Sequence, residues 1–577
     1  MKKLMLGNDA FARGIYEAGC KVVSSYPGTP STEITESAAK YKEVYAEWAP
    51  NEKVAMEVAL GASIAGARSF CGMKQVGLNV AADPHNTASY TGENGGMVIA
   101  VADDPGMHSS QNEQDSRYHA IASKILMLEP SDSGECKEFV KQAFDLSEKY
   151  DTPVIVRMST RVAHSQSSVE LCEREEKELK NYEKNPQKYV MMPAFAKKRH
   201  VVVEERMKQL AEFAEISELN KTEINSSKTG IITSGISYQY AKEVFGDTVS
   251  YLKLGIVNPL PEKLIKDFAA ECDEIYVIEE LEDIIETKCD RLGIKVKGKE
   301  LFGYIGELSQ AIIAEKILGK KQETESFGED IPVRPPVMCA GCPHRGLFYS
   351  LSKLKVNVMG DIGCYTLGAS APLNAMDATI CMGASISSLH GFNKARGEEA
   401  EKNTVAVIGD STFMHSGMTS LVNITYNSTN STVIILDNSI TGMTGHQQNP
   451  TTGYNLKGDV ASKICLEDLC KALGIKRVRV VDPYDMAETE KVIKEELAVE
   501  KASVIISRRP CALLKYVKHK PALKVDTDKC ITCKACLKIG CPAISIKNSK
   551  ACIDHTQCVG CGICQEMCKF DAIGGNK

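Results

Sequence analysis

The sequence has no long apolar run, no strong excess of either charge and no targeting segment at its start. No apolar stretch approaches the ~18 residues of a membrane-spanning helix. The 577 residues carry a net charge of −6, and this slightly acidic balance argues against nucleic acid as the main partner. The start, MKKLMLGNDA, reaches Asn8 and Asp9 too early for the apolar core of a signal peptide. We therefore expect a cytoplasmic protein with no membrane or nucleic-acid partner.

Nucleotide-binding loops are missing as well. No Gly-x-Gly-x-x-Gly follows an apolar run, and GIKVKGKE imitates a phosphate loop but ends in Glu300 instead of Ser or Thr. The Cys-x-x-Cys pair at Cys339 and Cys342 has no second pair at zinc spacing and no thioredoxin-like surroundings. The sequence therefore argues against hydride transfer to a dinucleotide, against a phosphate-loop NTPase and against a zinc or thioredoxin site.

Cysteine, by contrast, is abundant. Nine of the 22 cysteines fall between Cys530 and Cys568, and a reducing cytosol favours metal ligation over disulfides. The segments CITCKACLKIGCP and CVGCGICQEMCKF each contain Cys-x2-Cys-x2-Cys followed shortly by a fourth cysteine. This spacing lets three thiolates wrap one iron–sulfur cube. Structural zinc is the alternative, but zinc sites rarely use the triple run.

The tail is therefore predicted to hold two [4Fe–4S] clusters. In two-cluster ferredoxins the fourth ligand of each cluster comes from the opposite motif. One predicted ligand set is Cys530, Cys533, Cys536 and Cys568, and the other is Cys558, Cys561, Cys564 and Cys541. The four residues before Cys541 and the lysine at 569 depart from the usual motif, and neither removes a ligand. Cys552 fits neither set. Such a module is an electron relay, so the rest of the chain must supply or consume electrons.

The body alternates short β-branched runs with helix-length segments, a pattern typical of parallel α/β folds. The predicted strands lie in 97–103, 152–159, 229–235, 273–280, 403–410, 431–438 and 502–509. The highly charged stretch 171–228 is predicted to be a solvated helical connector. Further breaks are expected near 319–336 and 518–524. The fold class is therefore α/β, with three parallel-sheet domains and a ferredoxin-like α+β tail.

Two predicted strands of the third domain end in oxygen-bearing side chains. Asp410 follows one apolar run, and Asn438 follows the next run 28 residues later. One βα crossover fills the gap, so both side chains are expected at the ligand-binding edge of the sheet. Hard oxygen ligands suit Mg²⁺ that also grips a diphosphate. A plain turn would explain either residue alone.

This spacing resembles the thiamin diphosphate motif, with Ser411 in place of its usual second glycine. By that resemblance Asp410, Asn438 and the carbonyl of Ile440 bind Mg²⁺. The loop TGMTGHQ, together with CAGCPHRG and DIGCYTLG, is similar to the 2-oxoacid:ferredoxin oxidoreductases. The resemblance implies that these segments contact the cofactor through Cys339, Gly341, Cys342, His344, Cys364, Gly409, Ser411, Thr441 and Met443. Small buried cysteines are the alternative for CAGC and DIGC.

The first domain resembles the same family in YPGTPS and in a small-residue helix. The resemblance implies that Thr29 reaches the substrate or cofactor. It also places the carboxylate that activates the cofactor nine residues before Gly61, at Glu52. Glu57 is the nearest competitor, and a charged residue at a helix start is ordinarily solvated. His108 and Gln111, in a polar loop after a strand, are candidates for substrate contact.

Together these segments resemble the α subunits of indolepyruvate ferredoxin oxidoreductases over essentially the whole chain. The resemblance implies a pyrimidine-type domain (1–190), a charged helical connector (191–227), a transketolase C-terminal-like domain (228–330), a diphosphate- and Mg²⁺-binding domain (331–518) and a 2×[4Fe–4S] ferredoxin-like domain (519–577).

It further implies oxidative decarboxylation of aryl pyruvates with coenzyme A, with electrons passing singly through the clusters to ferredoxin. A smaller β subunit is the implied partner, in a dimer of heterodimers. The alternatives are a thiamin-dependent enzyme for another 2-oxoacid, a decarboxylase or carboligase with regulatory clusters, and an electron-transfer protein with a non-catalytic body.

Overall fold

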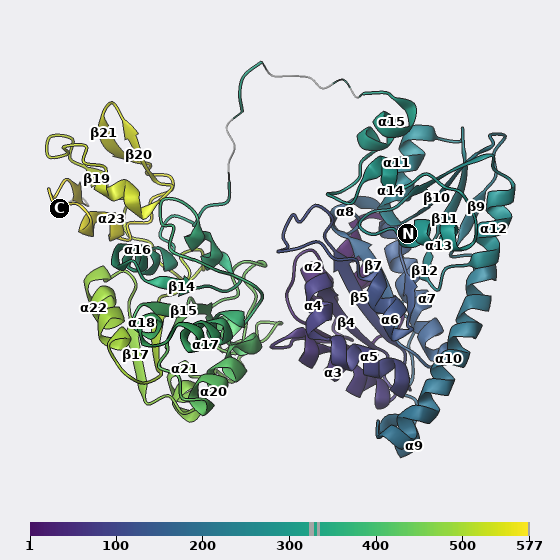
Figure 1. Ribbon diagram of the computed structural model, residues 1–577, viewed down its shortest axis with the longest axis horizontal. Coiled ribbons are helices and arrows are strands. Elements are labelled where there is room, and N and C mark those ends of the chain that lie inside the picture. The colour runs from purple at the N-terminus through teal and green to yellow at the C-terminus, as the bar shows by residue number, and fades with distance from the viewer. Residues whose placement is uncertain (322, 324–327, 332–334, 575–577) are drawn as a thin grey trace. The chain divides into compact units, whose positions relative to one another are not determined.

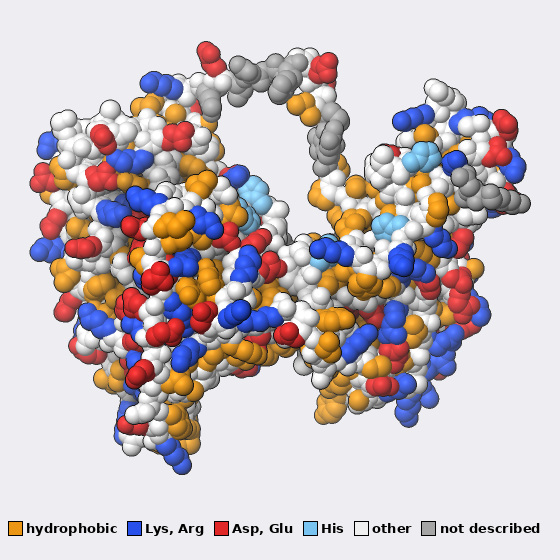
Figure 2. Space-filling view, turned by 180° about the vertical axis from the view of Figure 1, so that it is seen from behind, with side chains coloured by type: hydrophobic (Ala, Val, Ile, Leu, Met, Phe, Trp, Pro, Cys, Tyr) orange, Lys and Arg blue, Asp and Glu red, His pale blue; other side chains and the backbone are white. Residues whose placement is uncertain are grey.

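The computed structural model describes residues 1–321, 323, 328–331 and 335–574. The fold divides into two compact units, Met1–Gly328 and Glu329–Lys577 (Figure 1). The predicted break at 319–336 contains this division, and its residues 322, 324–327 and 332–334 lie outside the described part. None of the described helices is both long and apolar enough to cross a bilayer. On the face shown in Figure 2, basic and acidic side chains are mixed over much of the surface.

The first unit is built on a seven-stranded sheet whose neighbours are parallel except at one edge. Its strands, in spatial order, are β12 (Ile256–Asn258), β6 (Leu126–Leu128), β7 (Val154–Ser159), β5 (Met97–Asp103), β4 (Ser69–Lys74), β2 (Val22–Ser25) and β3 (Tyr45–Trp48). Only β12 is antiparallel to its neighbour. Central strands such as β5 and β7 are buried throughout, which fits their continuous apolar runs.

Helices cover both faces of this sheet. Cys71 packs with one group of helices, whereas Phe70, the residue before it, meets Phe11 on the opposite face at a centroid distance of 5.7 Å. The first face carries α3 (Glu52–Ile64), α4 (Gln75–Val80), α5 (Ala82–Thr91) and α6 (Arg117–Ser123). The other carries α1 (Gly7–Glu17) and α7 (Ser133–Tyr150). The short elements are α2 (Thr32–Ala38), α8 (Thr160–His164) and the antiparallel pair β1 (Lys2–Leu6) and β8 (Gln166–Glu170).

A four-stranded sheet completes the first unit. Its order is β13 (Glu274–Ile278), β10 (Thr229–Ser234), β11 (Ser250–Leu254) and β9 (Lys221–Glu223), with only β9 antiparallel. The helices are α11 (Gly235–Phe245), α12 (Glu262–Ala270), α13 (Ile284–Arg291), α14 (Lys299–Phe302) and α15 (Gln310–Leu318). Because β12 follows β11 along the chain but joins the larger sheet, the two sheets are tied together within one unit.

The predicted connector contains α9 (Pro186–Tyr189) and the long helix α10 (Pro193–Ile216). It is not solvated along its whole length, because Val203, Leu210 and Ala214 are fully buried. Arg206 is buried too and donates to the carbonyl of Ser89 at 2.7 Å. One side of α10 therefore packs on α5, although most of the connector's residues are charged or polar.

The second unit contains a five-stranded parallel sheet of order β14 (Asn357–Met359), β15 (Thr404–Gly409), β16 (Thr432–Asp437), β18 (Ser503–Arg508) and β17 (Arg477–Val481). One face packs against α16 (His344–Leu354) and α22 (Met486–Leu497). The other packs against α17 (Ala384–Arg396), α20 (Met418–Tyr426) and α21 (Leu466–Ala472). Shorter elements are η1 (Cys364–Ala369), α18 (Glu398–Glu401), α19 (Asp410–Thr412) and η2 (Phe413–Gly417).

The cysteine-rich tail forms a small α+β module in the same unit. It has two antiparallel pairs, β19 (Lys524–Val525) with β22 (Ile573–Gly574) and β20 (Ile544–Lys547) with β21 (Lys550–Ile553). Its helical turns are η3 (Ala535–Ile539) and α23 (Ile563–Glu566). The ferredoxin-like fold class is confirmed here, and each of the seven predicted strand segments contains a strand.

Candidate functional site

Asp410 and Asn438 stand at the ends of two neighbouring strands. β15 and β16 are adjacent and parallel, with Gly409 paired to Leu436 in the ladder. Asp410 comes directly after β15, and Asn438 directly after β16. Both are buried. The carboxyl ends of parallel strands meet at one edge of the sheet, so the two predicted Mg²⁺ ligands lie at the same edge.

Asp410 is a buried carboxylate with no basic side chain within 4.0 Å in the part of the chain that the structure describes. Burial, followed by the nearby Asp437, raises its pKa to about 7. Its Oδ1 accepts from the backbone N–H of Ser411 at 2.7 Å, and its Oδ2 accepts from the hydroxyl of Thr451 at 3.3 Å. A divalent cation would supply the missing positive charge, so the site fits Mg²⁺.

The loop after Asn438 folds back over this edge. The backbone N–H of the buried Ile440 donates to Oδ1 of Asn438 at 3.2 Å. The Asn449 amide donates to the hydroxyl of Thr441 at 3.4 Å, and the Thr451 hydroxyl donates to Oδ1 of Asn449 at 2.7 Å. Because Thr451 also contacts Asp410, these hydrogen bonds join the end of β15 to the loop that follows Asn438. No motif or spacing pointed to Asn449 or Thr451, which stand out in the sequence only as part of a polar loop.

Two further predicted residues lie beside this edge. Nε2 of the buried His344 is 3.4 Å from Nδ2 of Asn438, and burial lowers the pKa of His344 to about 4, so the ring is neutral. An added Cβ at Gly409 would lie 2.7 Å from the ring of Tyr365, which itself meets His344 edge-on. Gly409 is therefore required by close packing. Among the other predicted cofactor residues, Ser411 is buried, Thr441 is half-buried and Met443 is exposed.

Four thiols gather at the same place, and one of them had no signal in the sequence. Cys364 lies near the strand-end loop, since an added Cβ at Gly442 would be 3.4 Å from its sulfur. The backbone N–H of Cys511 donates to the carbonyl of Asn438 at 2.9 Å. Burial and then the thiols of Cys511 and Cys339 raise the pKa of Cys364 to about 11. Burial, and then the thiols of Cys339 and Cys364, likewise raise the pKa of Cys342. The set Cys339, Cys342, Cys364 and Cys511 has the number of thiols that a cubane cluster takes.

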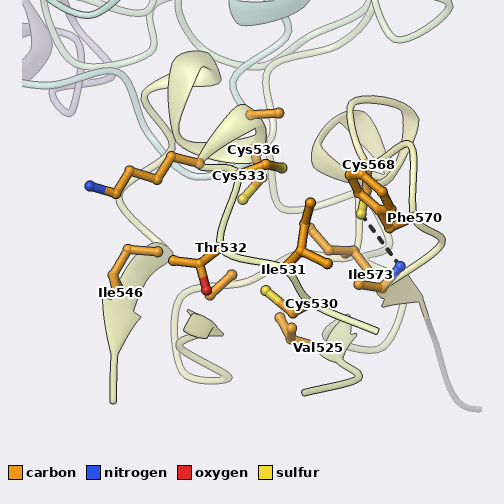
Figure 3. A pocket seen from close by; sticks show the side chains of 14 residues that line it. Val525, Cys530, Ile531, Thr532, Cys533, Cys536, Ile546, Cys568, Phe570 and Ile573 are labelled. Atoms are coloured by element: carbon orange, nitrogen blue, oxygen red, sulfur yellow. Dashed lines mark hydrogen bonds between the residues drawn. The ribbon is translucent and has the colours of Figure 1, made fainter. Parts of the chain in front are cut away.

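The first predicted cluster set lines one hollow of the tail. Cys530, Cys533, Cys536 and Cys568 all line it, together with apolar neighbours that include Ile531 and Phe570 (Figure 3). Its lining residues lie between Val525 and Ile573. The structure thus brings the fourth cysteine from the second motif to the first three, and this grouping fits an iron–sulfur cluster.

The second predicted set also comes together. Burial, and then the thiols of Cys561, Cys541 and Cys558, raise the pKa of the Cys564 thiol. Burial, and then Cys541 and Cys558, likewise raise the pKa of Cys561. Binding of a cluster would remove the repulsion between neighbouring thiolates, because the iron ions would neutralise their negative charge. Cys552 pairs with Ser545 in the β20–β21 hairpin, outside both sets.

The tail contacts the loop that carries Cys339 and Cys342. One guanidinium nitrogen of the buried Arg345 donates to the carbonyls of Ile539 and Gly540, at 2.9 and 2.6 Å. Its other nitrogen donates to the carbonyls of Met338 and Cys339. Arg345 therefore ties the tail to the CAGC loop. Sequence reasoning passed over Arg345.

The same loop touches the second cysteine set more directly. Gly341 has φ +68°, and an added Cβ there would lie 2.2 Å from Val559, the residue after Cys558. The Tyr484 hydroxyl donates to the carbonyl of Gly341. Only glycine fits this left-handed, closely packed position, so the contact between tail and loop depends on Gly341.

In the first unit, burial separates Glu52 from its competitor. Glu52 begins α3 and is 4% exposed, whereas Glu57 is exposed and pairs with Lys53. An added Cβ at Gly77 would lie 2.6 Å from Oε1 of Glu52, so the start of α4 has room for the carboxylate only because residue 77 is glycine. Glu57 has the solvated position of an ordinary surface charge.

Thr29 lies at the same sheet edge, in the loop after β2. Its carbonyl accepts from the hydroxyl of Ser109 at 3.1 Å. Lys74, which ends β4, is buried and donates to the carbonyl of Ser109 at 2.8 Å. An added Cβ at Gly28 would meet the Lys74 side chain at 3.2 Å. Lys74 was missed because a lysine at a strand end is usually a solvated residue.

The two loop candidates of this unit are more exposed. Gln111 is exposed. His108 is exposed as well, and its Nε2 lies 3.3 Å from Oε2 of Glu307. Its loop is held by Asp104, whose Oδ2 accepts from the backbone N–H of Ser109 and from the hydroxyl of Ser110. The loop is therefore ordered by hydrogen bonds, and His108 has a structural partner.

Comparison with known proteins agrees with both halves of this picture. Residues 13–229 match the family model described as "Pyruvate flavodoxin/ferredoxin oxidoreductase, thiamine diP-bdg". Residues 361–507 match "Thiamine pyrophosphate enzyme, C-terminal TPP binding domain". The second match spans Asp410, Asn438 and the loop between Asn438 and Thr451. The chain therefore has thiamine pyrophosphate-binding domains in both units.

Full-length relatives are more specific. "Indolepyruvate oxidoreductase subunit IorA" of Pyrococcus horikoshii is 42% identical, over 99% of this chain and 96% of that one. The Archaeoglobus fulgidus subunit of the same name is 38% identical, over 99% and 97%. A solved 2-oxoglutarate:ferredoxin oxidoreductase of Magnetococcus marinus is 19% identical, with a TM-score of 0.47, over 55% of this chain and 65% of that chain. Since the first two matches extend over nearly the whole of each chain, the protein belongs to the indolepyruvate oxidoreductase subunit IorA family of oxidoreductases.

Proposed function

We propose that this chain is the thiamin diphosphate- and iron–sulfur-binding subunit of an enzyme that oxidatively decarboxylates aryl pyruvates, indolepyruvate and phenylpyruvate among them. The 2-oxoacid and coenzyme A would give arylacetyl-CoA and CO₂, and two electrons would pass singly to ferredoxin. A smaller β subunit would complete substrate and coenzyme A handling, in a dimer of heterodimers. The choice of indolepyruvate follows the name of the two full-length relatives.

One observation carries the proposal. Within the second unit, the residues at the ends of β15 and β16 and the cysteine-rich tail meet through the CAGC loop and Arg345. Thiamin diphosphate supplies the nucleophilic carbon and the electron sink when it is bound. Electron transfer needs the clusters close to the cofactor edge, and this contact brings the tail close to it, whereas a regulatory or unrelated iron–sulfur module would not need that proximity.

The chain's own residues take separate roles. Asp410, Asn438 and the carbonyl of Ile440 would hold Mg²⁺, and the loop from Thr441 to Thr451 would enclose the diphosphate. Glu52 would hydrogen-bond the aminopyrimidine ring and hold a proton there. Thr29, in the loop that also contacts Ser109, would reach the substrate.

For the cysteines of the second unit we propose a role beyond lining the cofactor. Cys364 is close enough to Cys339 and Cys511, and Cys342 to Cys339 and Cys364, for the thiols to raise one another's pKa. Four converging thiols fit a third cubane cluster, which would shorten the distance that electrons cross between the cofactor edge and the tail. Small buried cysteines, the alternative weighed from sequence, would not need to converge.

Iron content tests this assignment. The anaerobically purified chain should contain about twelve iron atoms, four for each cubane. Cys511→Ser should lower the count to about eight and leave the two tail clusters spectroscopically intact. Cys552→Ser is the matched control and should change nothing. About eight iron atoms in the unaltered chain would refute the third cluster while leaving the tail clusters in place.

Lys74 is proposed to receive the carboxylate of the 2-oxoacid. The ammonium group is buried at the strand edge, close to the Thr29 loop, and within the described residues it donates one hydrogen bond, to the backbone carbonyl of Ser109. Lys74→Met should raise KM for the 2-oxoacid about 10- to 100-fold, because a hydrogen bond to a charged group contributes ~1.5–3 kcal/mol. Lys53→Met, an exposed lysine on α3, is the control. An unchanged KM in Lys74→Met would contradict the role.

The pH dependence gives a second readout for Lys74. Burial lowers its pKa to about 8, with Asp104 and Glu52 opposing the shift. The positive charge is therefore present below that pH and is lost as the pH rises through about 8. KM for the 2-oxoacid should increase across this range, and Lys74→Arg, which stays charged, should remove the increase. The same rise in the arginine variant would assign it to another group.

Viologen reduction tests the overall function. With the partner subunit present, reduction should require both the 2-oxoacid and coenzyme A. Aldehyde release without an acceptor would favour a decarboxylase instead, and absence of bound thiamin diphosphate after gentle purification would favour an electron-transfer protein. Screening indolepyruvate, phenylpyruvate, pyruvate and 2-oxoglutarate in this assay decides the substrate.

A further inference from the structure

Arg345 is a buried cation without an acidic partner. It is only 3% exposed, and among the described residues no carboxylate lies within 4.0 Å of its guanidinium group. Its four hydrogen bonds go to uncharged backbone carbonyls, and its Nε has no partner in the described part of the chain. A buried charge is costly unless another charge compensates it. The side chains around Arg345 therefore leave its positive charge without compensation.

Each side of this guanidinium group faces a loop that carries predicted cluster ligands. One terminal nitrogen donates to the carbonyl of Gly540, the residue before Cys541, at 2.6 Å. The other donates to the carbonyl of Cys339 itself, at 3.0 Å. Arg345 therefore lies between two of the cysteine sets. The CAGC set is Cys339, Cys342, Cys364 and Cys511, and the Cys558 set is Cys541, Cys558, Cys561 and Cys564.

The charge of Arg345 acts on one thiol in each of these two sets. Burial raises the pKa of Cys342 and of Cys561, and Arg345 opposes the rise in both. The Cys530 set has different surroundings, because the hollow that it lines is formed by residues between Val525 and Ile573 only (Figure 3). Arg345 is therefore next to two of the three cysteine sets and does not line the third. The Cys530 set is Cys530, Cys533, Cys536 and Cys568.

We propose that Arg345 is the counter-charge of the clusters on either side of it and raises the reduction potential of the cluster in the Cys558 set. The inference rests on the proposed function and adds to it a positioning residue for electron transfer. A cubane held by four thiolates is an anion, and each electron that it accepts makes it one charge more negative. A fixed cation in a water-poor interior stabilises this reduced form more than the oxidised form. Arg345 therefore favours the movement of each electron from the cofactor edge into the tail and disfavours its return.

Reduction potentials in the assembled, cofactor-loaded enzyme test the proposal. A redox titration followed by EPR measures them, and Cys536→Ser and Cys564→Ser assign the signals of the two tail clusters. Arg345→Gln should shift the Cys558-set cluster toward its oxidised form at least about tenfold, a fall of ~59 mV for one electron. Coulomb attraction between unit charges even ~10 Å apart exceeds a factor of ten at an effective dielectric constant of ~20. The cluster of the Cys530 set should shift less than that of the Cys558 set.

Arg345→Lys separates the charge from the hydrogen bonds. Lysine keeps the positive charge but lacks the planar fork that bonds to carbonyls on both sides. The contact between tail and loop is therefore weakened in both variants, whereas the charge is lost only in Arg345→Gln. The potential in Arg345→Lys should stay closer to that of the unaltered enzyme. Lys353→Met, which removes an exposed charge further along α16, is the matched control and should leave every potential unchanged. The shift in Arg345→Gln should persist at high salt, because salt screens buried charges little.

An unchanged potential in Arg345→Gln would overturn the proposal. Equal falls in Arg345→Gln and Arg345→Lys would overturn it too, because the hydrogen bonds and not the charge would then set the potential. If Arg345→Gln loses the Cys558-set cluster, iron content decides: retention of that cluster in Arg345→Lys supports the need for the charge, and its loss from both variants contradicts it. The proposed function fails separately. Clusters of the unaltered enzyme that no 2-oxoacid reduces would refute that function, while a shift in Arg345→Gln measured with dithionite would still support the role of Arg345.

Discussion

Glu52→Gln should lower 2-oxoacid-dependent turnover about 10²–10⁴-fold, the range that a positioned proton-transfer group contributes. Glutamine keeps the size of the side chain and a hydrogen bond, but it cannot hold and release a proton at the aminopyrimidine ring. The space beside Gly77 that accepts the carboxylate accepts the amide equally well, so the fold should persist. The rate of viologen reduction with saturating 2-oxoacid and coenzyme A measures the effect.

The control for this variant is close by. Glu57→Gln changes the exposed glutamate five residues further along α3, where an ion pair with Lys53 is worth little in water. Its activity should equal that of the unaltered enzyme. The iron–sulfur spectrum should be the same in both variants, because neither residue is in the unit that contains the tail. Full activity in Glu52→Gln would show that Glu52 is not the carboxylate that activates the cofactor.

Asp410→Ala should weaken thiamin diphosphate binding more than about 100-fold, since outer partners of a metal ligand alone are worth 10- to 100-fold. The carboxylate is the one charged group in the predicted Mg²⁺ set, and without it the cation and the diphosphate lose their shared anchor. Titration of the cofactor at fixed Mg²⁺ measures the change. Asp468→Ala, an exposed carboxylate on α21, is the matched control.

The cofactor-free stability of Asp410→Ala separates loss of a ligand from loss of the fold. Burial raises the pKa of Asp410, so its ionised form is costly in the cofactor-free chain. Removing the carboxylate should therefore leave the melting temperature of the cofactor-free chain within a few degrees of that of the unaltered one. Unchanged cofactor affinity in a folded variant would remove Asp410 from the metal site.

The strands that position these residues could be predicted because they are short, β-branched and buried on both faces. β5 occupies the predicted range 97–103 in full, and β15 and β16 end directly before the predicted ligands. The strands β9 and β12 could not be predicted, because three residues are too few to show an alternation of apolar and polar side chains. Their partners lie far away in sequence, and β12 belongs to a sheet made otherwise of residues before 160.

Within the site, motif spacing predicted the residues that lie close together in the sequence. It missed the residues that only the fold brings together. The cysteine triplets pointed to their own hollow, and the rule for two-cluster modules added Cys568. Cys511 is a lone cysteine after β18, and only the fold brings it to Cys364. Lys74 and Arg345 were missed for the same reason: only their burial in the fold marks them as unusual, and their residue types do not.

The most direct test of electron transfer from cofactor to tail is whether the 2-oxoacid itself reduces the clusters. The anaerobic holoenzyme, with its partner subunit and without external acceptor, is mixed with the 2-oxoacid while the iron–sulfur absorbance is followed. Bleaching should occur, should depend on thiamin diphosphate and Mg²⁺, and should be lost in Glu52→Gln and Asp410→Ala. Clusters that bleach with dithionite but never with any 2-oxoacid, in an enzyme that holds its cofactor, would contradict it.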